Sequence, residues 1–116
     1  MSSAAGFTSI RLYRTVGPQE MADVILTGLL RPGPPSFQGK WLVESVHDAA
    51  RWGRRFFQQA GLPFHVVEVE VAVAVADRWY RDPNLDRIGP ARYAEIADLP
   101  QITIVCEVGT IPIWPP

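Results

Sequence analysis

The segment from Phe64 to Val75 constrains the fold more than any other part of this chain. Valine recurs at every second position from Val67 to Val75, and the positions between carry glutamate or alanine. Because side chains alternate between the two faces of a strand, a period of two predicts a β-strand with one buried face. Such a strand needs partner strands and a second layer over its apolar face. The chain therefore has to form a sheet packed against helices.

Other segments supply those partners. Alternation predicts strands at residues 10–16, 40–44 and 102–108, with an extension at 111–114 after a turn at Gly109-Thr110. Helices are predicted from Pro18 to Gly28 and from about Val46 to Ala60. Residues 77–100 are expected to be mostly an irregular loop, with turns at 82–84 and 89–90. This order predicts one α+β domain of 116 residues with a small, mostly antiparallel sheet and two main helices.

The patterns also predict which side chains are buried. The first helix carries an apolar stripe of Met21, Val24 and Ile25. One face of the second helix is formed by Ala49, Trp52, Phe56 and Ala60. In the last strand the predicted buried face includes Ile102, Ile104, Cys106 and Val108, so Cys106 is expected in the core.

Composition narrows the function classes. Eleven Lys and Arg against twelve Asp and Glu argue against nucleic-acid binding and give no support for membrane binding. No apolar run approaches the ~20 residues that span a bilayer, and Met1 to Gly6 does not resemble a signal peptide, so a cytoplasmic location is expected. One cysteine and two distant histidines match no metal-site spacing. Ten of the eleven basic residues are arginine, and Lys40 is the only lysine.

Several residues are candidates for chemistry. The stretch 77–100 combines aromatic, arginine and carboxylate side chains, which suit stacking, phosphate binding and proton transfer, although surface ion pairs would also explain them. Arg14 shares a strand face with apolar residues, so it is either paired or in a cleft, unless the strand ends near Tyr13. Ser45 is expected to cap a helix. Glu68 and Glu70 form either a catalytic pair or the solvated face of the long strand.

Three short motifs resemble the ADP-ribosyltransferase superfamily, especially its small bacterial members. An early strand ends in Tyr13-Arg14-Thr15 and is followed at once by a helix. Lys40-Trp41-Leu42-Val43-Glu44-Ser45 is followed by Trp52-Gly53 in an alanine-rich helix. Arg81-Asp82-Pro83-Asn84-Leu85 is similar to a stretch of the rifamycin-modifying enzymes.

The resemblance implies a split sheet that holds NAD, which would be a substrate, in a central cleft. It places Arg14 where a His or Arg contacts the adenosine or ribose. Trp41, or Leu42 if the register differs by one, takes the place of a tyrosine near the nicotinamide. The implied catalytic acid is Asp82, which matches a loop acid, or Glu95. The NAD-binding residues implied in this way are Tyr13, Arg14, Trp41, Ser45 and Tyr93.

The expected activity is transfer of ADP-ribose from NAD to a small-molecule or protein acceptor. The sequence has no clear tyrosine at the second motif and no Glu-x-Glu pair before the last strand. Two alternatives therefore stay open: a non-catalytic module that binds a ligand or partner, and a natural-product enzyme that uses the same fold. A carboxylate near the ribose would stabilise the positive charge that develops when the bond to nicotinamide breaks.

Overall fold

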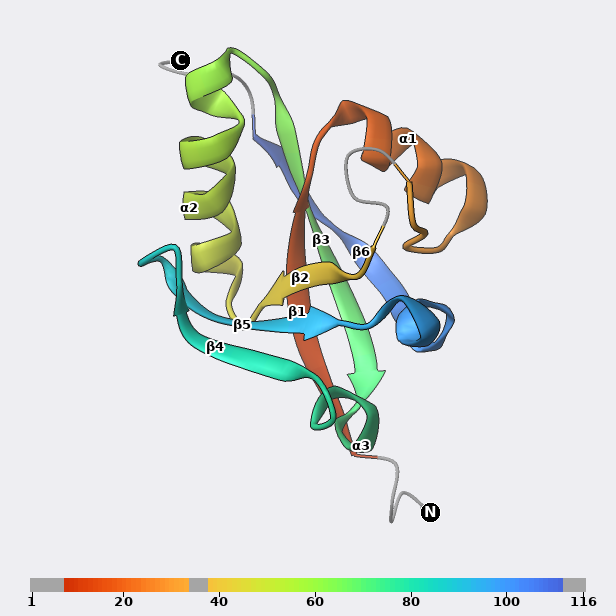
Figure 1. Cartoon of the computed structure of the whole chain (residues 1–116). Coiled ribbons are helices and arrows are strands. Elements are labelled where there is room, and N and C mark those ends of the chain that lie inside the picture. Colours follow the sequence, from red (N-terminus) through yellow and green to blue (C-terminus); the bar gives the residue numbers. More distant parts are fainter. Residues whose placement is uncertain (1–7, 34–37, 112–116) are drawn as a thin grey trace.

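A six-stranded antiparallel sheet organises the chain (Figure 1). The computed structural model describes residues 8–33 and 38–111. Within them the strands lie in the order β4-β5-β2-β1-β3-β6, and each pair of neighbours is antiparallel. This confirms an α+β fold with an antiparallel sheet and two main helices. The strands are β1 (Ser9–Val16), β2 (Lys40–Val43), β3 (Phe64–Ala72), β4 (Tyr80–Leu85), β5 (Gly89–Ala94) and β6 (Thr103–Ile111). The helices are α1 (Pro18–Thr27), α2 (Val46–Phe56) and the short α3 (Val73–Ala76), with 3₁₀ turns η1 (Gln58–Ala60) and η2 (Ile96–Gln101).

The sheet is split between β1 and β2. These strands meet at one residue pair, Tyr13 with Val43, whereas β1 and β3 pair continuously at eight positions. The sheet therefore has two halves, β1–β3–β6 and β2–β5–β4. Figure 1 shows β2 and β5 lying across the direction of β1 and β3. One six-stranded sheet thus has a short junction between these two halves.

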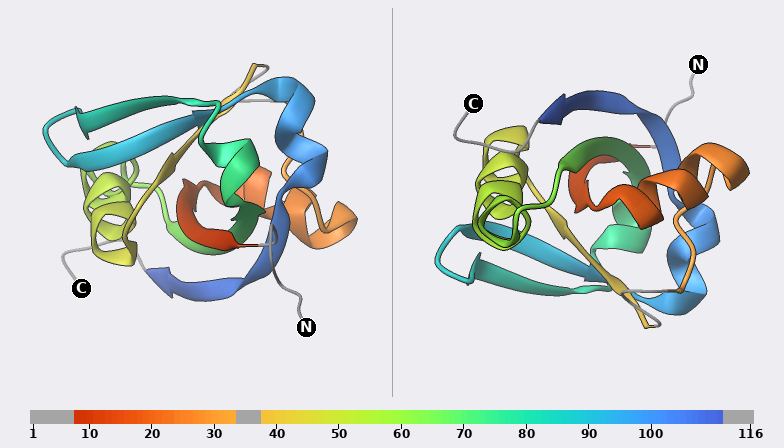
Figure 2. Two further views of the ribbon diagram at one scale, coloured as in Figure 1. Left: turned by 90° about the horizontal axis from the view of Figure 1, so that it is seen from below. Right: turned by 90° about the horizontal axis from the view of Figure 1, so that it is seen from above.

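Each face of the sheet carries its own apolar cluster. Helix α2 covers one face, and α1 lies at the other end of the molecule (Figure 2). The cluster on the α1 face includes Leu12, Val16, Met21, Val24, Leu42, Val67, Val69, Val71 and Leu99. The cluster on the α2 face is built on Val43, Ala49, Phe64, Val66 and Ala91, with Tyr13, Trp41, Trp52, Phe57 and Leu85 packed against it. The alternating valines of β3 from Val67 to Val71 are buried as predicted.

The long strand is shorter than predicted. β3 ends at Ala72, which pairs with Ser9 at the start of β1, and residues 73–76 form α3 instead. The backbone N–H of Val73 donates to Thr8 O at 2.9 Å. Alternating valine and alanine fit a helical turn as well as a strand, so the end of the partner strand decides the boundary. Val75 and Ala76 remain buried in the core.

The prediction of a mostly irregular stretch at 77–100 is wrong. It contains the β4–β5 hairpin and η2. Pro83 lies in β4, an edge strand, where a residue without an N–H is tolerated. The hairpin turn has no glycine at its tip. Asp86 and Arg87 adopt the left-handed conformation there, with φ of 52° and 62°. Prolines and an unusual turn concealed the hairpin in the sequence.

Three buried-face predictions are corrected. Ile25 is 75% exposed, because the buried face of α1 is formed by Glu20, Met21 and Val24. Phe56 is exposed and Ala60 lies on η1, since α2 ends at Phe56; Phe57 packs inward in their place. Cys106 and Val108 are both exposed, because register shifts between β3 and the edge strand β6 interrupt the alternation.

The C-terminal predictions are only partly testable. β6 continues through Gly109 and Thr110 to Ile111, so the turn predicted there is wrong. The rest of the predicted extension, residues 112–114, lies outside the described residues. None of the helices in the described part of the chain is long and apolar enough to cross a bilayer.

Candidate functional site

A cavity of about 140 Å³ lies where β1 and β2 separate. Beyond the Tyr13–Val43 pair no further pairing joins the two strands in the described ranges, and side chains from both line the opening. The lining residues are Tyr13, Arg14, Thr15, Glu20, Trp41, Val43, Trp52 and Phe57. Four of these eight are aromatic, so the cavity offers flat apolar walls to a ligand.

Local contacts place α2 over this opening. Ser45 begins the helix, and its Oγ accepts a hydrogen bond from the backbone N–H of Asp48 at 3.1 Å. Thr15 Oγ1 donates to Ala49 O at 2.5 Å and ties the helix to β1. Gly53 lies against the ring of Phe64 so closely that a Cβ there would overlap it. These contacts bring Trp52 to the cavity.

The polar end of the cavity is a buried ion cluster. Arg14 Nε and Nη2 donate to the two carboxylate oxygens of Glu20 at 2.7 and 3.0 Å. Arg14 Nη1 donates to Trp41 O at 3.0 Å and so bridges β1 and β2. Lys40 Nζ lies 3.2 Å from Glu20 Oε2, and its side chain is 1% exposed. Because the strands separate here, Arg14 and Glu20 reach the cavity from the α1 face of the sheet.

The contacts in this cluster shift the pKa values of two of its members, Glu20 and Lys40. Burial opposes ionisation of Glu20, but the hydrogen bonds and charges of Arg14 and Lys40 outweigh it, so the pKa of Glu20 lies below its ordinary value. Burial, together with the charge of Arg14, lowers the pKa of Lys40. Two basic groups thus surround one carboxylate.

Three of the residues implied for NAD binding share this cavity: Tyr13, Arg14 and Trp41. The expectation that Arg14 is paired or in a cleft is confirmed on both counts. A fourth residue, Tyr93, packs edge-on against Trp41 with ring centroids 5.2 Å apart, behind the cavity wall. Leu42, the alternative to Trp41, is fully buried on the opposite face.

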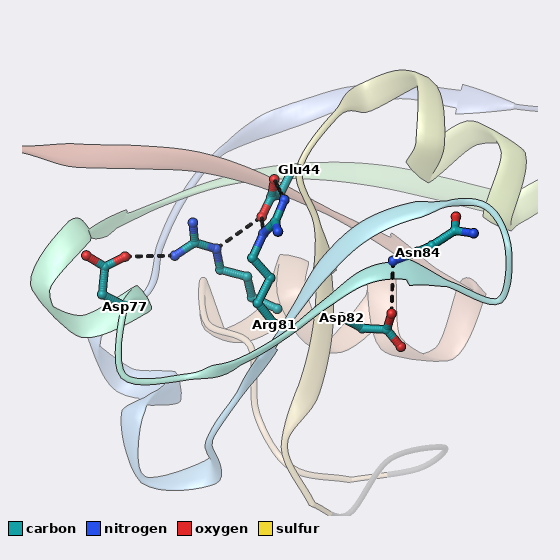
Figure 3. Close-up of polar contacts among 6 residues, drawn as sticks. Glu44, Asp77, Arg81, Asp82 and Asn84 are labelled. Carbon is teal, nitrogen blue, oxygen red and sulfur yellow. Dashed lines mark hydrogen bonds and ion pairs between the residues drawn. The ribbon is translucent and has the colours of Figure 1, made fainter.

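The other three predicted residues lie outside the cavity lining formed by the described residues. Ser45 caps α2. Glu95 is exposed just before η2. Asp82 lies on β4, where its Oδ1 accepts from Asn84 N at 2.9 Å (Figure 3). Asp82 pairs with Ala91, which pairs with Val43, so Asp82 is in the cross-strand row of Tyr13 but two strands beyond β2.

The charged residues around 77–100 pair chiefly with one another and with Glu44. Arg81 Nε and Nη2 hold Glu44 at 2.7 and 3.1 Å, and Arg92 Nε adds a contact at 3.2 Å (Figure 3). Arg92 Nη1 also lies 3.1 Å from Asp77 Oδ1. The hydrogen bond from Arg81, aided by Arg92, holds the pKa of Glu44 below its ordinary value despite partial burial. This network braces β2, β5 and β4 on the α1 face.

The glutamates of β3 belong to a similar surface pairing. Arg11 bonds Glu68 and its Nε lies 3.9 Å from Glu70, which also accepts from Ser9. They form the solvated face of β3, as one of the two sequence interpretations expected.

The sequence analysis did not predict five of the eight lining residues as site residues: Thr15, Glu20, Val43, Trp52 and Phe57. Glu20 looks like an ordinary acid in the first turn of a helix, and only the convergence of Arg14 and Lys40 explains its burial. The available signal was the only lysine of the chain, a charge at the start of an otherwise apolar strand. The sequence analysis placed Trp52 on the correct helix. The spacing of residues along the chain does not show which strand residues lie across the cavity from it.

Residues 8–33 and 38–111 contain no group of three or more His, Cys, Asp or Glu side chains that could hold a metal ion. Comparisons with protein-family models, with curated proteins and with solved structures found no match to this chain.

Proposed function

We propose that the chain binds NAD with the nicotinamide end in the cavity between β1 and β2, and transfers ADP-ribose to a small-molecule or protein acceptor. One observation carries the proposal: Tyr13, Arg14 and Trp41, which the family resemblance assigns to NAD, come from separate strands and line one cavity. Residues 27 positions apart are brought into contact by the hydrogen bond from Arg14 to Trp41 O.

The cavity walls support a flat ring as the bound group. Aromatic rings stack or pack edge-on against planar ligands. Trp52 Nε1 is buried and has no hydrogen-bond partner among the described residues. A carboxamide on the bound ring would bring an acceptor oxygen, and burying a donor without a partner costs free energy. A nicotinamide ring therefore suits this lining.

Arg14 contributes differently from the role that the resemblance implies. Its nitrogens already hold Glu20 and Trp41 O, so it shapes the cavity and does not present a free fork to phosphate. In the transfer, the bond between ribose C1 and the nicotinamide nitrogen breaks, and nicotinamide leaves with the electron pair. An acceptor oxygen or nitrogen forms the new bond to C1 and gives up its proton. A carboxylate would stabilise the charge on the ribose. Asp82, which the resemblance implies, lies on the same face of the sheet as Tyr13 and is the acid that we test.

The test is titration of the protein with NAD, followed by tryptophan fluorescence, since Trp41 and Trp52 line the cavity. We expect quenching in the millimolar range or below, and a dissociation constant at least tenfold higher for Tyr13→Ala. Leu26→Ala is the control: Leu26 is 82% exposed and lies outside the cavity lining. If NAD does not bind at millimolar concentration, or the two variants weaken binding equally, the proposal is wrong.

A second candidate, a non-catalytic binding module, is favoured by the state of Glu20. This carboxylate lines the cavity but is held by two cations, so it is poorly suited to face a developing positive charge. Release of nicotinamide separates the candidates. A transferase releases it in the presence of an acceptor or water and loses the activity in Asp82→Asn. NAD binding without any release identifies a binding module.

A further inference from the structure

A groove lined by arginines runs between α2 and the tip of the β4–β5 hairpin. Its volume is about 340 Å³, and its lining consists of Arg51, Arg54, Arg55, Gln59 and Ile88. Figure 2 shows α2 beside the hairpin in both views. The groove shares no lining residue with the cavity between β1 and β2.

Two of the arginines are held in place by the hairpin backbone. Arg51 Nη1 donates to Ile88 O at 2.8 Å, and Arg55 Nη1 donates to Asp86 O at 2.6 Å. Each bond uses one terminal nitrogen, so other N–H groups of each guanidinium remain available. Side chains fixed in this way lose little conformational freedom when they bind a ligand.

Arg87 is not a lining residue, but it precedes Ile88 of the lining at the hairpin tip and adds a fourth arginine to this region. Arg87 adopts a φ of 62° next to Asp86 at 52°, a region that glycine or asparagine enters more easily. Among the described residues, the side chains of Arg87 and Arg54 have no hydrogen bond or ion pair, and both residues are exposed. Non-glycine residues in this region often occur at functional sites.

The local charge is unbalanced. Arg51, Arg54, Arg55 and Arg87 face two acids, Asp48, which lies 3.5 Å from Arg51, and Asp86. These six residues carry a net charge of +2, and the rest of the chain carries −3, since the whole chain has a formal charge of −1.

We infer that this groove binds the diphosphate group of a compact ligand. Planar guanidinium forks match phosphate oxygens and bind them with charge-assisted hydrogen bonds. A compact ligand is favoured over a nucleic-acid strand because the basic region ends at the groove and the rest of the chain carries an acidic excess. The inference is independent of NAD binding in the cavity.

The experiment is a titration with inorganic pyrophosphate at constant ionic strength, followed through the arginine Nε–Hε resonances. The test variant is Arg54→Gln/Arg87→Gln, which removes two unpaired surface charges and leaves the bonds to the hairpin backbone intact. The control is Arg31→Gln/Arg78→Gln, which removes the same charge outside the groove. We expect shifts at Arg51 and Arg55, with binding at least tenfold weaker in the test variant and within twofold of wild type in the control.

Three further probes define the ligand. Inorganic phosphate is expected to bind more weakly than pyrophosphate, because it engages fewer guanidiniums. ADP tests the source of the diphosphate: equal affinity assigns the groove to the diphosphate alone, and tighter binding assigns it to a nucleoside diphosphate. The inference is overturned if pyrophosphate does not bind at millimolar concentration, if inorganic phosphate binds as tightly, or if both double variants lose the same affinity.

Discussion

Lys40, the only lysine of the chain, is almost completely buried beside Glu20 and Arg14. A buried charge is tolerated when opposite charges and hydrogen bonds replace water, and removal of one partner is costly because it leaves the others uncompensated. Glu20 is the central member, since it contacts both cations. The cluster therefore depends on this carboxylate more than on either base.

We expect Glu20→Gln to lower the free energy of unfolding by about 3 kcal/mol at neutral pH. The folded pKa of Glu20 is below its ordinary value of 4.5, so ionisation of Glu20 stabilises the fold above that pH. This stabilisation is lost as the pH falls through the folded pKa. The difference between wild type and Glu20→Gln is thus expected to shrink in acid, as measured by urea unfolding at pH 7 and at successively lower pH.

Lys40→Met serves as the comparison for this cluster. It leaves the bidentate pair of Arg14 and Glu20 and fills a similar volume, so we expect a smaller loss of stability than in Glu20→Gln. An equal or larger loss would show that Lys40, and not Glu20, is the central member of the cluster.

At the scale of the elements, the close approach of α2 to β3 depends on one glycine, Gly53. Alanine normally stabilises a helix relative to glycine by about 1 kcal/mol. At Gly53, however, a Cβ would overlap the ring of Phe64, and overpacking of a core costs about 1–3 kcal/mol. We expect Gly53→Ala to destabilise the fold by about 1–2 kcal/mol, measured by chemical denaturation.

A double variant tests whether the ring is the cause. Phe64→Leu shortens the side chain that a Cβ at position 53 would meet, so the loss in Gly53→Ala/Phe64→Leu is expected to be smaller than the sum of the single losses. A stabilised Gly53→Ala protein would mean that α2 moves away from β3 at no cost, and the proposed close packing would be wrong.

The elements differ in how well their sequences reveal them. β1, β3 and α1 were predictable because a clear period marks each of them, and the start of α2 was predictable because Ser45 caps it. The β4–β5 hairpin was not, since Pro83 and Pro90 resemble loop residues and its turn uses Asp86 and Arg87. An edge strand tolerates proline because one side of it forms no ladder, but a sequence does not show which strand is at the edge.

The cavity was predictable only in part for a related reason. Strand alternation placed Arg14 on the apolar face, and the family resemblance selected Tyr13 and Trp41. Glu20 and Phe57 join them through the packing of α1 and the end of α2, which are tertiary contacts without a local signal. Asp82 and Glu95 were chosen for their chemistry, and the register of β4 and the start of η2 place them away from the lining.

At the scale of the whole molecule, the two halves of the sheet are joined weakly through the backbone. One residue pair, Tyr13 with Val43, connects β1 to β2, while eight consecutive pairs connect β1 to β3. Regions with fewer shared hydrogen bonds open at lower free energy in native-state hydrogen exchange. The half formed by β2, β5 and β4 is therefore expected to open separately from β1 and β3.

Arg14 reinforces this junction, because its guanidinium connects β1 to Trp41 O on β2 and to Glu20 on α1. We expect amides of β4 and β5 to exchange faster than those of β1 and β3 in the wild-type protein. Arg14→Lys keeps the charge but loses the fork, so exchange in β2, β5 and β4 is expected to accelerate more than exchange in β3. Arg11→Lys, on the opposite face of the same strand and paired with Glu68, is the matched control and is expected to leave β5 unchanged. Equal opening free energies for both halves, or a uniform acceleration across the sheet in Arg14→Lys, would mean that the sheet unfolds as one unit and that the cavity is not at a mobile junction.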